Sequence, residues 1–81
     1  MLLMSKKQLL TGNDLATLAQ RFRKAAGKSR AEAGRELNVS HVSIHRAEEN
    51  PEESLLRLRT RMIEAYSPFK VTGPVFYLEK K

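Results

Sequence analysis

The chain has 81 residues, a length that allows one small domain, and it contains no cysteine, which excludes disulfides, thiolate metal ligands and cysteine nucleophiles. No apolar run approaches the ~18 residues needed to span a membrane, and no secretory signal opens the chain, so we expect a cytoplasmic protein. Fifteen basic residues outnumber nine acidic ones, for a net charge of +6, and this balance favours a polyanionic partner such as DNA, RNA or an anionic membrane surface.

The first predicted helix follows a short N-terminal arm. Residues 1–10 lack clear hydrophobic periodicity, and we expect them to form a flexible arm. Thr11-Gly12-Asn13 then provides a helix start, and Gly27 provides a helix end. Between them, apolar residues recur at three- and four-residue spacing, as on one face of an amphipathic helix: Leu15, Leu18, Ala19, Phe22 and Ala26.

Two short helices joined by a tight turn are predicted over residues 30–48. Ser29 and Glu32 have the spacing of a capping box at the start of the first of these helices. Asn38 tolerates the left-handed conformation of a tight turn, and Ser40 can cap the second helix. The positions expected to face inward are all apolar or small: Ala33, Gly34, Leu37, Val39, Ile44 and Ala47. Gly34 is expected where the two helices approach so closely that only a very small side chain fits.

A fourth helix is predicted to begin at Asn50-Pro51 and to end before Ser67-Pro68, since asparagine is a good cap and proline suits the first helical position. Its buried side is expected to consist of apolar and aromatic residues: Leu55, Leu58, Met62, Ile63 and Tyr66.

Residues 68–81 favour a β-strand, the only one predicted in the chain, and Gly73-Pro74 predicts a bulge, a kink or an edge position within it. A lone strand cannot satisfy its own backbone hydrogen bonds, so we expect it to pair with the same strand of a second copy across a twofold axis. The alternative is a frayed tail whose aromatic side chains pack on the helices. The residues expected at the dimer interface are Phe69, Val71, Val75, Phe76, Tyr77 and Leu78.

Two helices joined by a tight turn form the motif that places its second helix in the major groove of DNA. On this motif, residues 18–50 resemble the Cro/C1-type, or Xre-like, helix-turn-helix family, whose common pattern lGVSqstISriEnG corresponds here to LNVSHVSIHRAEEN. The resemblance implies a mainly α, four-to-five-helix, lambda-repressor-like DNA-binding domain over residues 11–67, with its motif at 29–48. Four positions depart from the family pattern, namely Arg30 in place of glutamine, Asn38 in place of glycine, and Glu49-Asn50 in place of Asn-Gly.

The predicted recognition helix, residues 40–48, carries four residues that helical spacing directs outward on one side: His41, Val42, His45 and Arg46. The resemblance implies that these positions reach base edges. Arg46 can donate two hydrogen bonds to guanine, and Val42 can touch a thymine methyl group. For each of the four, the alternative is a phosphate contact or exposure to solvent. Phosphate contacts are expected near helix N-termini and from nearby polar or basic side chains: Lys28, Ser29, Arg30, Arg35, Ser40 and Ser43.

The basic charge is concentrated around this motif. From Arg21 to Arg46 there are seven basic residues and two acidic ones (Glu32 and Glu36), a net charge of +5 out of the chain's +6. The resemblance also implies a structural ion pair between Arg23 and Glu48, which would join the first helix to the end of the third.

Other site chemistries are poorly supported. His41 and His45 have the one-turn spacing of zinc ligands, but a stable site needs three or four ligands, and Glu49 is the only carboxylate nearby on that face. No nucleophile–base motif, glycine-rich phosphate loop or paired-carboxylate pattern occurs. We therefore expect that the protein is not an enzyme and that it binds neither a metal ion nor a cofactor.

These observations predict a homodimer that binds an inverted-repeat operator in double-stranded DNA and represses transcription, as an autorepressor of a phage or mobile-element type operon. The alternative is an antitoxin of a toxin–antitoxin pair, which would bind a toxin protein and repress its own promoter. In that case the C-terminal strand would contact the toxin instead of a second copy.

Overall fold

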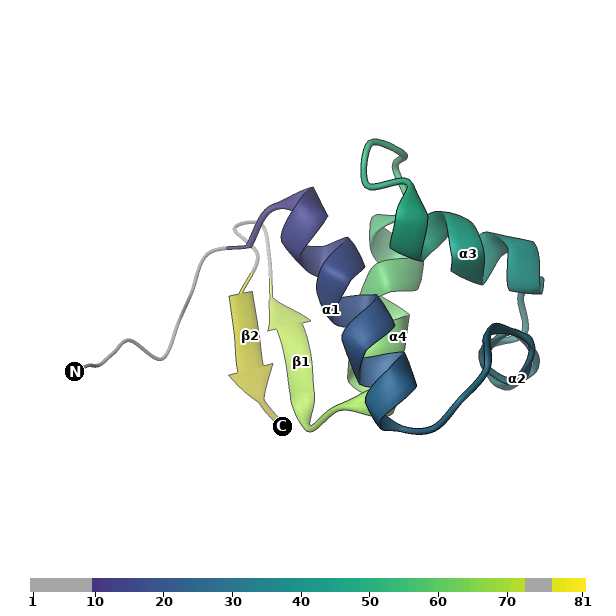
Figure 1. Cartoon of the computed structure of the whole chain (residues 1–81). Coiled ribbons are helices and arrows are strands. Elements are labelled where there is room, and N and C mark those ends of the chain that lie inside the picture. Colours follow the sequence, from purple (N-terminus) through teal and green to yellow (C-terminus); the bar gives the residue numbers. More distant parts are fainter. Residues whose placement is uncertain (1–9, 73–76) are drawn as a thin grey trace.

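The computed structural model describes residues 10–72 and 77–81, which form four helices and one small antiparallel sheet (Figure 1). In chain order the elements are α1 (Gly12–Ala25), α2 (Arg30–Leu37), α3 (His41–Glu49), α4 (Leu56–Tyr66), β1 (Phe69–Thr72) and β2 (Tyr77–Lys80). The described part of the chain is therefore mainly helical, as predicted. None of the helices in this part is long and apolar enough to cross a membrane.

The helix α1 begins where the sequence predicts. The Thr11 hydroxyl accepts a hydrogen bond from the backbone N–H of Asp14 (3.1 Å), and the Asp14 carboxylate accepts one from the backbone N–H of Thr11 (2.9 Å). This capping box gives partners to two N–H groups near the start of the helix. Gly27 follows the helix with a φ of +74°, which glycine adopts without strain. Ala26 lies beyond the last helical residue and is exposed, so its predicted place on the buried face is wrong.

The helices α2 and α3 and the turn between them form the predicted helix-turn-helix arrangement. Ser29 caps α2 through reciprocal hydrogen bonds with Glu32, and Ser40 caps α3 by accepting a hydrogen bond from the backbone N–H of Ser43. Asn38 ends α2 in the left-handed conformation, with a φ of 61°. The predicted caps and turn residue are therefore confirmed.

Gly34 is the point of closest approach within this motif. A Cβ atom built on Gly34 would lie 2.7 Å from the backbone oxygen of Val39 and 3.2 Å from the backbone nitrogen of His41. Backbone atoms cannot move aside as a flexible side chain can, so any residue larger than glycine would push the turn away from α2. The expected need for a very small side chain is confirmed, and the neighbour is the backbone of the turn and of the start of α3.

The hydrophobic core receives side chains from all four helices. α1 packs along α4, and α2 and α3 cover the same core from the other side (Figure 1). The buried members of the core are Leu15, Ala19, Ala33, Leu37, Ile44, Ala47, Met62 and Ile63. Burying a leucine, isoleucine or methionine side chain is worth about 1.5–3 kcal/mol, so this core holds α3 firmly against the rest of the domain.

The fourth helix begins later than predicted. The pattern Asn50-Pro51 predicts its start, but α4 begins at Leu56. The side chain of Arg59 reaches back from α4 and donates hydrogen bonds to the carbonyl oxygens of Asn50 (2.7 Å) and Glu53 (3.0 Å). The same carbonyls also accept hydrogen bonds from the backbone N–H groups of Glu53 (3.0 Å) and Leu55 (2.9 Å), which are tight-turn contacts and not the i to i+4 bonds of an α-helix. A loop held by these turns and by a buried arginine therefore stands where the first turn of the helix was expected.

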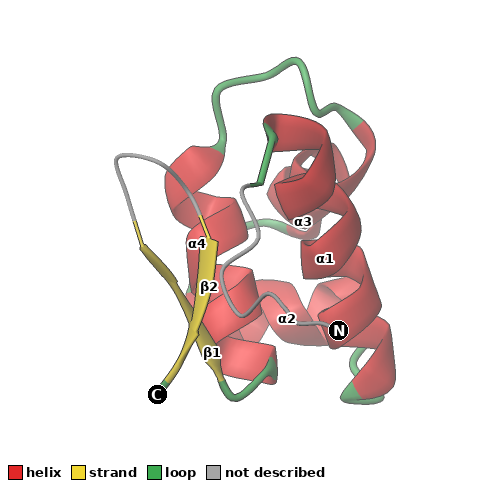
Figure 2. Cartoon of the chain, turned by 90° about the vertical axis from the view of Figure 1, so that its left-hand side faces the viewer, coloured by secondary structure: helices red, strands yellow, loops and turns green. Residues whose placement is uncertain are grey.

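Two strands follow α4, which ends at Tyr66 as predicted. β1 and β2 pair antiparallel in a register that places Phe69 opposite Lys80 and Val71 opposite Leu78 (Figure 2). The prediction of one lone strand is wrong, because each strand finds its backbone partners in the other strand of the same chain. The frayed-tail alternative is wrong for the same reason, and these hydrogen bonds do not require a second copy.

Three of the six residues predicted at a dimer interface are partly buried against this chain itself: Phe69, Val71 and Leu78. The rings of Phe69 and Phe22 lie 6.1 Å apart between centroids, so β1 contacts α1 as well as α4. Tyr77, the fourth, belongs to β2. The predictions made for residues 1–9, Gly73-Pro74, Val75 and Phe76 lie outside the described residues.

Candidate nucleic-acid interface

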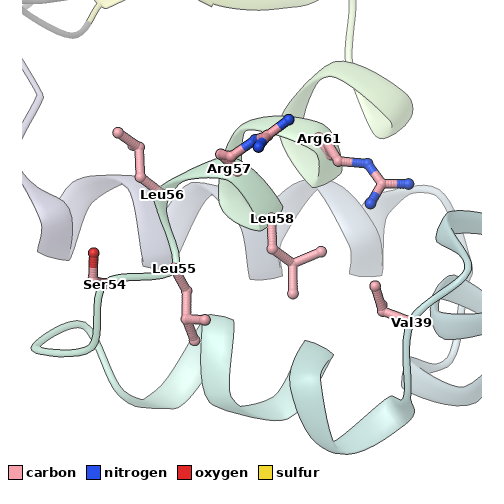
Figure 3. A pocket seen from close by; sticks show the side chains of 7 residues that line it. All are labelled: Val39, Ser54, Leu55, Leu56, Arg57, Leu58 and Arg61. Atoms are coloured by element: carbon pink, nitrogen blue, oxygen red, sulfur yellow. The ribbon is translucent and has the colours of Figure 1, made fainter.

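An apolar groove of about 440 Å³ lies beside the turn of the helix-turn-helix (Figure 3). Its lining comes from the turn, the loop before α4 and the first part of α4: Val39, Ser54, Leu55, Leu56, Arg57, Leu58 and Arg61. None of these seven side chains is a carboxylate or an imidazole. Across residues 10–72 and 77–81, no three His, Cys, Asp or Glu side chains form a group that could hold a metal ion.

The outer face of α3 carries the four residues predicted to contact bases, and all four are exposed: His41, Val42, His45 and Arg46. The opposite side of the helix carries Ile44 and Ala47, neither of which has exposed surface. Val42 is 49% exposed. The predicted orientation of α3 is therefore confirmed, and contact with bases stays a prediction.

Arg46 contacts a carboxylate that the sequence analysis did not consider. Its Nη2 donates to Oε1 of Glu53 at 2.5 Å, and its Nε donates to Oε2 of the same carboxylate at 3.3 Å. Glu53 lies in the loop before α4 and also accepts a hydrogen bond from the side-chain amide of Asn50 (2.8 Å). The hydrogen bond from Arg46, followed by that from Asn50, holds the pKa of Glu53 below its ordinary value.

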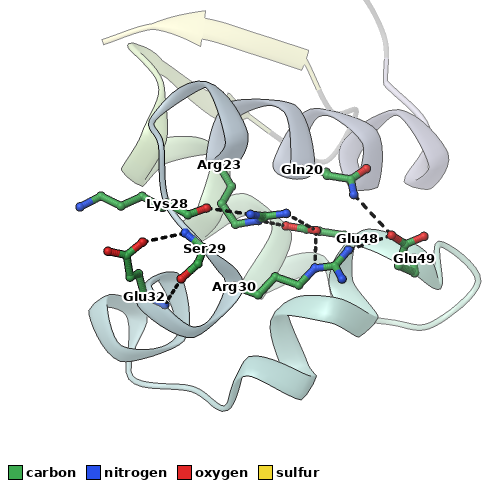
Figure 4. A network of polar contacts seen from close by, with 8 residues as sticks. All are labelled: Gln20, Arg23, Lys28, Ser29, Arg30, Glu32, Glu48 and Glu49. Atoms are coloured by element: carbon green, nitrogen blue, oxygen red, sulfur yellow. Dashed lines mark hydrogen bonds and ion pairs between the residues drawn. The ribbon is translucent and has the colours of Figure 1, made fainter.

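Glu48 lies at the centre of a buried network of charges at the end of α3 (Figure 4). Its side chain has no exposed surface, and its carboxylate accepts hydrogen bonds from Nε (2.5 Å) and Nη2 (3.0 Å) of Arg23. Nη1 of Arg23 also donates to the carbonyl oxygen of Lys28 (2.7 Å). The predicted ion pair between Arg23 and Glu48 is therefore present, and it joins α1, the loop before α2 and the end of α3.

Arg30 belongs to the same network and does not extend freely from the start of α2. Its Nε donates to Oε1 of Glu48 (3.0 Å), and its Nη2 donates to Oε2 of Glu49 (2.8 Å) (Figure 4). Glu49 also accepts a weaker hydrogen bond from the side-chain amide of Gln20 (3.3 Å). Arg30 was predicted to contact phosphate, but the structure engages its positive charge with two glutamates of α3.

Lys28 is another predicted phosphate ligand with a partner inside the chain. Its Nζ lies 2.7 Å from Oε2 of Glu36, and this hydrogen bond raises the pKa of Lys28. Glu36 also accepts a hydrogen bond from the hydroxyl of Tyr66 (2.6 Å). Both ends of the Lys28–Glu36 pair are substantially exposed to water, so it is weaker than the buried pair at Glu48.

The remaining predicted phosphate ligands lie at or near helix N-termini or on the surface of α2. Ser29 and Ser40 use their hydroxyl groups as caps, and the hydroxyl of Ser43 lies 3.1 Å from that of Ser40. Arg35 is exposed on α2. The structure thus places Ser40 and Ser43 together at the start of α3, with Ser29 separately at the start of α2.

Comparisons of this chain with protein-family models, with curated proteins and with solved structures found no significant match.

Proposed function

We propose that this protein binds double-stranded DNA in a sequence-specific manner as a homodimer and represses transcription, as an autorepressor of the phage or mobile-element type, without catalysis or a cofactor. The observation that carries this proposal is the arrangement of α2, the turn and α3, which presents four side chains to solvent from a rigidly supported helix. The resemblance of residues 18–50 to the Cro/C1-type, or Xre-like, family supports the same function and a lambda-repressor-like domain.

The dimensions of α3 suit the major groove. An α-helix with its side chains is about 10–12 Å across, and the major groove is about 12 Å wide, so a helix such as α3 fits within it. Capping serines lie at the N-termini of α2 and α3, where backbone N–H groups attract phosphate oxygens. These termini would fix the position of α3 on the duplex, while its exposed side chains would contact base edges.

The distribution of charge favours sequence-specific binding over non-specific attraction to DNA. Four of the seven basic side chains between residues 21 and 46 contact glutamates: Arg23, Lys28, Arg30 and Arg46. Non-specific affinity for DNA comes almost wholly from uncompensated positive charge, so these pairs reduce it. A protein of this kind depends more on the contacts of α3 with bases.

The C-terminal sheet has one occupied edge. The backbone N–H of Lys81 donates to the carbonyl oxygen of Pro68 (3.0 Å), and hydrogen-bonded pairs alternate with non-bonded pairs along an antiparallel ladder. The N–H groups of Phe69 and Val71 therefore point away from β2. They donate to the Ser67 hydroxyl and to the Glu64 carboxylate, respectively, each at 3.1 Å.

The other edge of the sheet is formed by β2, which lies on the side of β1 away from the helices (Figure 1). The same alternation turns the backbone groups of Leu78 and Lys80 outward along this edge. Pairing of β2 with β2 of a second copy would extend the sheet to four strands around a twofold axis. The proposed function requires that the dimer present its two copies of α3 to successive major grooves, about 34 Å apart, on an inverted repeat.

Selection of bound sequences from random duplex DNA tests this function. We expect enrichment of an inverted repeat whose half-sites are separated by about one helical turn. A pool that stays random at physiological salt would contradict the proposal. For the dimer, Lys80→Pro should yield a monomer by sedimentation because proline lacks the outward N–H, whereas Lys80→Ala should remain a dimer.

The outer edge of β2 has no backbone partner among residues 10–72 and 77–81, and this edge also favours a second candidate function, that of an antitoxin. A strand of a toxin protein could pair with β2 in place of the second copy. A purified chain that stays monomeric and forms a tight complex with a small protein encoded by an adjacent gene would favour the antitoxin. A stable homodimer that binds an operator on its own would favour the repressor.

A further inference from the structure

The loop that contains Glu53 is anchored from inside the protein. Arg59, which is 3% exposed, donates hydrogen bonds to the carbonyl oxygens of Ala47 (2.8 Å), Asn50 (2.7 Å) and Glu53 (3.0 Å). The first of these carbonyls belongs to α3 and the last to the loop, so one buried guanidinium fixes the loop relative to the recognition helix. The backbone of Glu53 is therefore held at a set distance from the outer face of α3.

The side chain of Glu53 also has hydrogen-bond partners within the described residues. Its carboxylate accepts a hydrogen bond from the Asn50 amide (2.8 Å) and two from Arg46 (2.5 and 3.3 Å). The side chain of Arg46 is 51% exposed and makes no other hydrogen bond within the described residues. A long side chain on an exposed helix face is thus restricted to one orientation by a carboxylate that is itself fixed.

The contact uses only one edge of the Arg46 guanidinium. Five N–H groups lie in the plane of a guanidinium, and the contact with Glu53 engages Nε and one N–H of Nη2. The second edge, formed by Nη1 and the other N–H of Nη2, keeps a pair of parallel donors. A pair of parallel donors is what a bidentate contact with O6 and N7 of guanine requires.

Resting on the proposed DNA-binding function, we infer that Glu53 is a positioning residue that determines base specificity: it fixes Arg46 through the Nε edge and presents the Nη1–Nη2 edge to a guanine in each half-site. An arginine fixed in this way loses less conformational freedom when it contacts the base. Its charge is partly compensated by Glu53, so it gains less from an unspecific contact with phosphate. Both effects increase the difference in affinity between the correct base pair and an incorrect one.

The matched pair of variants Glu53→Gln and Glu52→Gln tests this inference on the full chain. Both variants remove one negative charge from adjacent positions, and Glu52 is exposed. Dissociation constants are measured for the selected operator, for the operator with the Arg46-contacted guanine replaced, and for random duplex, all at one salt concentration. Glu52→Gln should strengthen binding to all three duplexes by a similar factor and leave the ratios unchanged. Glu53→Gln should lower the ratio between the first two duplexes by about tenfold, within the range of one bidentate base contact.

Three outcomes separate the possible explanations. If Glu53→Gln keeps the ratios of Glu52→Gln, the inference is wrong although the proposed function stands. If Glu53→Gln strengthens operator binding and sharpens the ratio, Glu53 acts as an inhibitory competitor for Arg46, and the inference is again wrong. If the wild-type chain distinguishes none of the three duplexes, the proposed function itself fails. As a control for coupling, Glu53→Gln should have no further effect on the ratio in an Arg46→Ala background.

Discussion

Among the arginine–glutamate pairs near the C-terminal end of α3, Arg23–Glu48 and Arg46–Glu53 differ most in their exposure to solvent. At Arg23–Glu48 the carboxylate has no exposed surface, whereas at Arg46–Glu53 the two side chains are 51% and 28% exposed. The contacts are alike in length and in the edge of the guanidinium that they use. The buried pair joins two helices, α1 and α3. The solvent-exposed pair instead holds Arg46, a surface arginine of α3, beside Glu53 in the loop before α4.

The largest expected effect on stability comes from a substitution in the buried pair Arg23–Glu48. Glu48→Ala would leave the guanidinium of Arg23 buried without a counter-charge, at a cost of about 3–5 kcal/mol in the free energy of unfolding. Urea denaturation measures this loss, with Glu49→Ala as the exposed neighbouring control. If Glu48→Ala lowers the free energy of unfolding by no more than Glu49→Ala does, the buried pair is not more important for stability than an exposed one.

A smaller loss is expected at Arg59, which supports the exposed pair from beneath. Arg59→Met would leave three backbone carbonyls without this donor, and water can reach only part of them, so we expect about 2 kcal/mol of destabilisation. The exposed Arg57→Met is the control. If the loop depends on Arg59, amide hydrogen exchange at residues 51–55 should accelerate more in Arg59→Met than exchange within α1.

Arg30 occupies an intermediate position, since it contacts both the buried Glu48 and the exposed Glu49. Arg30→Met should lower the free energy of unfolding by about 1 kcal/mol, because Glu48 keeps Arg23 as a partner. The dependence of DNA affinity on salt should stay the same, because the charge of Arg30 is already compensated. A salt slope reduced by about one unit would show that Arg30 leaves the glutamates for a phosphate.

The exposed pair should contribute least to stability. The urea midpoint of Glu53→Gln is expected to coincide with that of the wild-type protein, since solvent screens an exposed ion pair. A clear fall in the midpoint would mean that Glu53 supports the fold, and the loss of base discrimination could then no longer be assigned to Arg46 alone.

Glu36 contacts a neutral side chain in addition to Lys28, because it accepts a hydrogen bond from the hydroxyl of Tyr66. Partial burial and the hydrogen bond to Glu36 raise the pKa of Tyr66 to about 12, above its ordinary value of 10.0. The folded state therefore binds this proton more tightly than the unfolded state, so the contribution to stability is complete below pH 10 and is lost as the pH rises towards 12. Phenolate absorbance should show a late-titrating tyrosine that is missing in Tyr66→Phe. A wild-type protein in which both tyrosines titrate near pH 10 would contradict the contact.

The parts of the fold that the sequence predicted well depend on neighbours in the chain. The caps at Ser29 and Ser40 and the left-handed Asn38 involve contacts over three residues or fewer, so the residue types alone indicate them. The start of α4 was missed because it depends on Arg59, whose side chain reaches back to Asn50. A cap-like asparagine followed by proline does not reveal such a contact.

The C-terminal sheet was missed for a related reason. Gly73-Pro74 was interpreted as an interruption of one strand, although two four-residue strands on either side pair with each other. Alternating apolar residues have the same pattern in both cases, and only the register distinguishes them.

The side chains that contact Arg30 and Arg46 could be identified only from the three-dimensional structure. Periodicity along α3 correctly separated its exposed face from its buried face, and the resemblance correctly paired Arg23 with Glu48. Arg30 and Glu49 were noted separately as departures from the family pattern, yet they contact each other, so the second departure is compensated by the first. Arg46 and Glu53 lie in different elements, and no helical spacing relates them.

The anchored loop before α4 also bears on how new operator preferences could arise or be engineered. His41, Val42 and His45 face solvent, so substitutions there should leave the core intact and can be varied one at a time. Position 46 differs, because its side chain depends on position 53. A library that randomises the outer face of α3 while keeping Glu53 would retain a carboxylate suited to arginine alone. If α3 contacts bases as we propose, a change of base preference at position 46 should require a matching change at position 53.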